Sequence, residues 1–90
     1  MMNLAVILAL IDENRVGEAI AQLNAIIEKR PNDDALYFVR GNAFWKLGDR
    51  KHALDDYAVA ADLNPDSPAA IAYKHALEIM DFFNKDMYNP

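Results

Sequence analysis

The sequence offers few side chains that could do chemistry, and its two histidines are the first to consider. His52 is followed by Asp55 and Asp56 three and four residues later, and His75 precedes Glu78 by three residues. On a helix these spacings bring imidazole and carboxylate together on the surface, where they form an exposed charge pair. A metal ion at His52 would have one imidazole and flexible carboxylates as ligands, which is a poor set. We therefore expect no metal site and no cofactor.

Residues for nucleophilic or acid–base catalysis are also scarce. The chain has no cysteine, and its one hydroxyl of the serine or threonine type, Ser67, stands before Pro68 where a helix cap is expected. The acidic pairs at 12–13 and 33–34 fall at expected helix ends, without partners at the spacing of paired catalytic carboxylates. The three glycines stand alone, so no glycine-rich phosphate loop is present. This pattern predicts a protein that is not an enzyme.

Composition indicates one small folded domain with an acidic surface. The chain has 90 residues, of which 53% are hydrophobic and 26% charged, and this length allows a single domain with a modest core. Its 9 basic and 14 acidic residues give a net charge of −5, which argues against nucleic acid and anionic membranes as partners. The lack of cysteine fits a reducing compartment, so we expect a cytoplasmic protein.

The chain begins with a strongly apolar segment. Nine of the ten residues from Met2 to Ile11 are apolar, and Asn3 is the exception. A secretory signal has basic residues before its apolar stretch, whereas the first basic residue here is Arg15. The segment is also about half of the roughly 20 residues that a membrane helix needs. We expect no membrane insertion, and instead a helix that is buried in the fold or in an interface.

An internal repeat of 34 residues is the strongest regularity in the chain. The repeat places Ala19, Leu23, Ile26 and Pro31 34 residues before Ala53, Tyr57, Ala60 and Pro65, respectively. A small residue, a large apolar residue, a second apolar residue and a proline at one spacing indicate that one structural unit occurs twice.

Local signals predict five helices and no strand. The predicted helices are at about 2–13, 16–29, 34–47, 50–63 and 68–84. Asn14 and Gly48 tolerate the left-handed conformation that ends a helix, and Asp49 can cap the helix that follows. Pro65 ends the fourth helix.

The segment 34–67 resembles the tetratricopeptide repeat family. It carries the pattern Tyr37-x2-Arg40-Gly41-x2-Phe44, followed by Ala53-x3-Tyr57 and Pro65. Arg40 departs from the pattern, because the family usually has leucine there. The first unit matches mainly in its second helix, with Asn3 and Ile7 at the aromatic and small positions of its first helix. The third unit is a lone helix with Ile71 and His75 at those positions.

The resemblance implies an all-α fold, a short right-handed solenoid of antiparallel helix pairs. We expect a single domain over residues 1–90, with repeat 1 at about 1–33, repeat 2 at about 34–67, and a capping helix with a tail at 68–90. In that arrangement Gly41 and Ala53 lack bulk, which lets paired helices approach closely, and Tyr37, Phe44 and Tyr57 fill the space around the contact.

The family resemblance also implies a function, which is the binding of a peptide or protein segment by an adaptor or scaffold. The expected concave groove is lined by the first helix of each repeat, and its positions here are Leu4, Leu8, Ile11, Phe38, Asn42, Trp45, Lys46, Ala72, Ala76 and Ile79. We expect Phe38, Asn42, Trp45, Lys46 and Ile79 to contact the partner. Some members bind terminal carboxylates with a clamp of Lys, Asn and Arg. Only Asn42 matches that clamp, so chaperone tails are not expected partners.

Three questions stay open at the level of sequence. Phe38, Asn42 and Trp45 form one helical stripe about 100° from the packing stripe, and its aromatics either pack on neighbouring helices or bind a partner. The first helix is apolar on its packing face (Val6, Leu10, with Ile7 beside them) and on its groove face (Leu4, Leu8, Ile11). Its burial requires the capping helix, a second copy or another protein. The apolar tail residues Phe82, Phe83, Met87 and Tyr88 either cover the last helix pair or dock into a groove.

The alternative function follows from the second of these questions. If Leu4, Leu8 and Ile11 form a self-association surface, the chain is a structural module that forms a homodimer, and its groove is buried in the self-interface.

Overall fold

The computed structural model describes residues 4–83, and these residues form five helices and no strand. The helices are α1 (Leu4–Asp12), α2 (Val16–Lys29), α3 (Asp34–Leu47), α4 (Arg50–Leu63) and α5 (Pro68–Phe83). The number of helices and the bounds of α2, α3 and α4 agree with the sequence prediction. Within the described range, no helix is both long enough and apolar enough to span a membrane. The expected tail contacts of Met87 and Tyr88 lie outside the described residues, as do the side chains of Phe82 and Phe83.

Local signals set the helix ends as the sequence predicts. Asn14 and Gly48 both have positive φ, at 66° and 87°, and these two residues end α1 and α3. Asp49 caps α4, because its Oδ1 accepts a hydrogen bond from the backbone N–H of His52 at 3.2 Å. Ser67 caps α5, because its Oγ accepts from the N–H of Ala69 at 3.1 Å. Each cap satisfies a backbone donor that has no partner within its own helix.

The Asp49 cap makes the stability of the fold depend on pH in a defined direction. The backbone N–H of His52, and then its imidazole, hold the pKa of the Asp49 carboxyl below the ordinary value of 3.8. A carboxyl whose pKa is lowered by folding stabilises the folded state above its unfolded-state pKa, and this contribution is lost as the pH falls through the folded-state pKa. We expect Asp49→Ala to lower the midpoint of thermal unfolding at neutral pH, by an amount that shrinks as the pH falls below 3.8.

A matched variant separates the charge of Asp49 from its role as an acceptor. Asp49→Asn keeps a side-chain oxygen for the N–H of His52, so we expect a smaller loss than for alanine. A difference between wild type and Asp49→Ala that stays constant from neutral to acidic pH would contradict the prediction.

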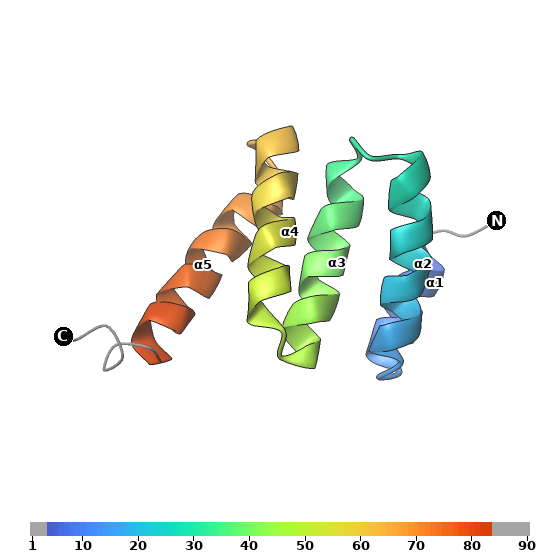
Figure 1. The fold of residues 1–90 in the computed structure, drawn as a ribbon, viewed down its shortest axis with the longest axis horizontal. Coiled ribbons are helices and arrows are strands. Elements are labelled where there is room, and N and C mark those ends of the chain that lie inside the picture. Colours follow the sequence, from blue (N-terminus) through green and yellow to red (C-terminus); the bar gives the residue numbers. More distant parts are fainter. Residues whose placement is uncertain (1–3, 84–90) are drawn as a thin grey trace.

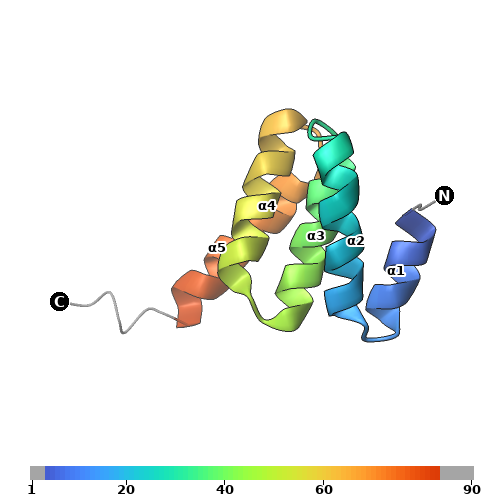
Figure 2. The same ribbon diagram turned by 45° about the vertical axis from the view of Figure 1, so that its right-hand side comes forward.

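The helices pack mainly on their neighbours in the sequence, and the molecule is elongated as a result. Helices α2 to α5 lie side by side in Figure 1, and Figure 2 shows α1 against α2 at one end. The principal-axis extents are 51, 28 and 18 Å. One buried cluster joins α1, α2 and α3 and consists of Ile7, Leu10, Ala19, Leu23, Ile27, Leu36 and Val39. A second cluster joins α4 and α5 and consists of Ala53, Tyr57, Ala60, Ala69 and Ala76, with aromatics of α3 packed against it.

Helices α3 and α4 form the most extensive contact, and Gly41 is part of it. A Cβ atom at Gly41 would lie 2.7 Å from the Tyr57 ring and 3.3 Å from the carbonyl oxygen of Ala53. The absence of a side chain at Gly41 therefore provides the space that the Tyr57 ring occupies, which confirms the expected close approach.

The packing face of α1 differs from the prediction. Ile7 and Leu10 are buried, as expected for the packing face, whereas Val6, which we also expected there, is 47% exposed. Leu4 and Ile11, expected on the groove face, are half-buried against the first core cluster. The reason is that Leu4, Ile7 and Ile11 follow each other at steps of three and four residues, which makes one stripe against α2. Of the three expected self-association residues, only Leu8 is well exposed.

Candidate functional site

An open pocket lies where α3, α4 and α5 meet. Its volume is about 170 Å³, and its lining residues are Trp45, Tyr57, Ala72, His75, Ala76 and Ile79. The four residues from α5 recur at three- and four-residue steps, so they share one face of that helix. The pocket is mainly apolar, and the lining residues whose side chains carry a polar group are Trp45, Tyr57 and His75.

Small side chains on α5 leave the space that the pocket occupies. Ala72 and Ala76 face two large rings, Trp45 of α3 and Tyr57 of α4. Ile79 lies at the rim and is 39% exposed. An apolar side chain that entered this space would contact aromatic and aliphatic surfaces together, which is the usual character of a recognition pocket.

Tyr57 is fixed in place by two residues of α3. Its hydroxyl donates a hydrogen bond to Oδ1 of Asn42 at 2.6 Å. The Phe38 ring lies 6.0 Å from the Tyr57 ring, centroid to centroid, at a tilt of 42°. Burial, with the charge of Asp56 as a smaller cause, raises the pKa of Tyr57 above its ordinary value. The phenol therefore stays neutral and keeps its proton for Asn42.

Trp45 forms the wall of the pocket that α3 provides. Its ring is half-buried against the second core cluster. The Arg50 guanidinium carbon lies 4.9 Å from the ring centroid, within the range of a cation–π contact. The ring is therefore held from one side by a cation and is open to the pocket on another.

The structure brings together some of the residues expected to contact a partner and separates others. Trp45 and Ile79 line the pocket. Phe38 and Asn42 do not line it, but both contact Tyr57, which does. Lys46 does not, because its Nζ donates to the carbonyl oxygen of Ile11 at 2.7 Å and so connects α3 to the end of α1. Leu4, Leu8 and Ile11 all lie on α1, on the opposite side of α3 from α5.

No model of a known protein family matches the chain, and no curated protein matches it. A solved structure does match, the solution NMR structure of Bacteroides fragilis protein BF1650. The two chains are 42% identical with a TM-score of 0.87, and the match covers 99% of this chain and 91% of the Bacteroides chain. This chain belongs to the family of that Bacteroides protein. The family fold is therefore the five-helix arrangement described above.

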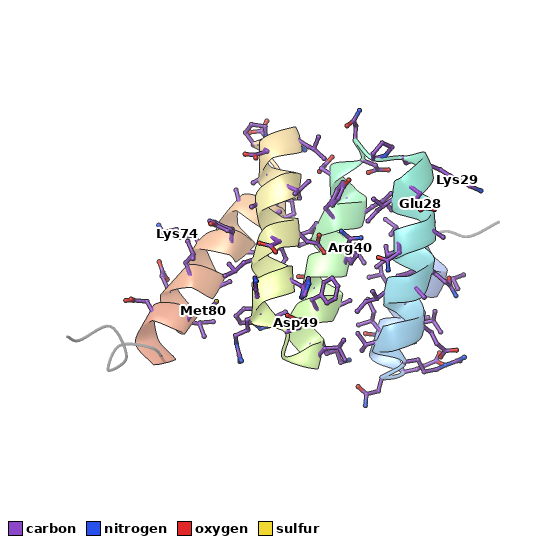
Figure 3. The ribbon with its side chains drawn as sticks, in the orientation of Figure 1. Glu28, Lys29, Arg40, Asp49, Lys74 and Met80 are labelled. Carbon is purple, nitrogen blue, oxygen red and sulfur yellow. The ribbon has the colours of Figure 1, made fainter. Side chains whose placement is uncertain are left out.

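In this member of the BF1650 family, Arg40 forms a network that the sequence analysis did not predict. Its Nε and Nη2 donate to both carboxylate oxygens of Asp56 at 2.8 and 2.7 Å, and its Nη1 donates to Oδ1 of Asn24 at 2.9 Å. Asp56 is only 5% exposed, and its hydrogen bond raises the pKa of Arg40 further. Arg40, labelled in Figure 3, thus connects three consecutive helices of this chain. The signal available in the sequence was the arginine at a position where the repeat pattern has leucine.

The prediction that His52 forms a charge pair with Asp55 and Asp56 is wrong. Asp56 forms its ion pair with Arg40. The Nδ1 of His52 lies 2.7 Å from Oδ2 of Asp49 instead. The His52 ring also lies 5.1 Å from the Phe44 ring, centroid to centroid. Among the residues that the structure describes, no group of three His, Asp or Glu side chains could hold a metal ion.

Proposed function

We propose that this chain is a non-catalytic interaction module, a short solenoid of the tetratricopeptide type, that binds a peptide or protein segment at the face shared by α3 and α5. The observation that carries the proposal is the pocket between Trp45, Tyr57 and Ile79. Aromatic residues at the centre of a partly apolar surface are typical anchors of protein interfaces. The sequence composition supports a cytoplasmic location for such a module.

A peptide-display selection tests the proposal, and the single tryptophan of the chain provides a direct reporter. Peptides selected on the wild-type protein should change the fluorescence of Trp45 as they bind. We expect Ile79→Asp to weaken their binding by about tenfold or more, because a carboxylate at the rim must be desolvated when an apolar side chain enters. Titration of each variant with the same synthetic peptide measures the change.

A matched control keeps this test specific. Leu77→Asp makes a similar change at a residue of α5 that is 43% exposed and is not among the residues that line the pocket. Its affinity for the selected peptides should stay close to that of wild type. Equal affinity of wild type and Ile79→Asp would contradict the proposal.

A second candidate function is self-association through α1, and the exposure of Val6 and Leu8, at 47% and 48%, favours it. In this alternative the chain is a structural module whose apolar surface is covered by a second copy. We expect Leu8→Glu to convert a homodimer into a monomer, because each charged side chain would be buried in the interface. Light scattering from low to high micromolar concentration measures the mass.

The control for self-association uses the other end of the molecule. Ile71→Glu introduces the same charge on α5, at an isoleucine that is 62% exposed. This variant should keep the mass of the wild type. A wild-type chain that is monomeric over the whole concentration range would exclude the self-association function.

A further inference from the structure

The pocket lies next to the point at which the chain leaves α5. Ile79 precedes the end of α5 at Phe83 by four residues, or about 6 Å along the helix axis. Trp45 lies in the last turn of α3, and α3 and α5 end on the same side of the molecule (Figure 1). The Trp45–Ile79 end of the pocket is therefore the end nearest to Phe83, where α5 ends.

We propose that the segment 84–90 of this chain, NKDMYNP, occupies the pocket and inserts the side chain of Met87 between Trp45 and Ile79. The inference rests on the same pocket as the proposed function and names its occupant in the free protein. The segment is then an intramolecular competitor of any external peptide.

The length of the segment fits this occupant. Met87 is four residues after Phe83, and an extended chain spans about 13 Å over four residues. The span exceeds the roughly 6 Å of helix axis between Ile79 and Phe83, so Met87 is within reach of Ile79 after the chain has turned back at the end of α5.

The chemistry of the segment fits as well. Methionine is unbranched and flexible, so it fills irregular apolar spaces, and its sulfur makes favourable contacts with aromatic rings such as those of Trp45 and Tyr57. A tethered segment also competes at a high effective concentration, on the order of millimolar for a short flexible linker.

Nuclear Overhauser effects (NOEs) of the full chain with labelled methionine methyl groups test the placement directly. We expect a cross-peak between the ε-methyl of Met87 and the indole of Trp45, assigned by its loss in Met87→Leu. Absence of that cross-peak overturns the proposal. A cross-peak that appears only between chains, in a mixture of labelled and unlabelled protein, also overturns it and assigns the pocket to the segment of a second copy.

Quenching of Trp45 fluorescence by acrylamide gives an independent measurement. A chain that ends at Phe83 should be quenched at least about twice as efficiently as the full chain, because the ring loses its cover. Met87→Asp should act in the same way, and Asn89→Asp, which adds the same charge two residues further on, should not. Circular dichroism checks that each variant stays helical. Equal quenching of the full chain and Met87→Asp overturns the proposal.

Peptide binding separates this inference from the proposed function. If the segment competes for the pocket, the chain that ends at Phe83 should bind the selected peptides about fivefold more tightly or better. Equal affinity with and without the segment overturns the inference and leaves the proposed function standing. A Met87–Trp45 cross-peak that no selected peptide displaces supports the inference and overturns the proposed function.

Discussion

Replacement of Asp56 by alanine is expected to lower the free energy of unfolding by about 2–4 kcal/mol. The variant leaves the Arg40 guanidinium between three helices with only Asn24 as a hydrogen-bond partner from that network. A charge that loses its buried partner keeps the cost of desolvation without the compensating attraction. The estimate is at the lower end for a buried ion pair because the Arg40 side chain is 20% exposed. Urea unfolding followed by circular dichroism measures the loss.

Two further variants test whether the loss of stability comes from the interaction between Arg40 and Asp56. Arg40→Leu restores the residue that the repeat pattern usually has, yet it leaves the Asp56 carboxylate buried, so we expect it to destabilise as well. The double variant Arg40→Leu/Asp56→Ala should lose at least about 1 kcal/mol less than the sum of the two single losses. Additive losses would show that the two side chains do not stabilise each other. Asp55→Ala, at the exposed neighbouring carboxylate, should change stability by less than about 0.5 kcal/mol.

Replacement of Gly41 by alanine is expected to lower the free energy of unfolding by about 1–3 kcal/mol. The new methyl group would lie 2.7 Å from the Tyr57 ring, and that ring is held by Asn42 and contacted by Phe38. The carbonyl oxygen of Ala53 at 3.3 Å restricts movement in the other direction. The cost of the clash exceeds the helix propensity gained from alanine, which is about 1 kcal/mol at most. Thermal and urea unfolding of the variant measure the difference.

Gly17 provides the matched control for Gly41. It lies in the first turn of α2, and a Cβ there would meet nothing within 4 Å. Gly17→Ala should therefore stabilise the protein by up to about 1 kcal/mol, because alanine lowers the conformational entropy of the unfolded chain and has the higher helix propensity. If Gly41→Ala also stabilised the protein, the close approach of α3 and α4 would not depend on the missing side chain.

The helices were predictable because the signals that bound them are local. The positive φ of Asn14 and of Gly48 follows from which residue types tolerate that conformation. The caps at Asp49 and Ser67 each involve a hydrogen bond to a residue two or three positions further along the chain. These interactions do not depend on how the helices pack, so they can be inferred from a short stretch of sequence.

The site was only partly predictable because its contacts depend on the relative placement of helices. The stripe of Phe38 and Trp45 was identified, and both rings prove to be half-buried against the second core cluster. The bond from Lys46 to Ile11 spans 35 residues, and no helical spacing predicts it. The partner of Asp56 was missed for the same reason, since Arg40 lies on a different helix.

Figure 2 shows the helices in sequence order, and this order affects how the chain folds. Because the main contacts join consecutive helices across turns of two to four residues, the contact order of the native state is low. Closing such short loops costs little entropy, and proteins rich in local contacts fold fast. Structure can form first between α3 and α4 and then spread to both ends, one helix at a time. A destabilising substitution in a terminal helix would then mainly lower the stability of the helix next to it.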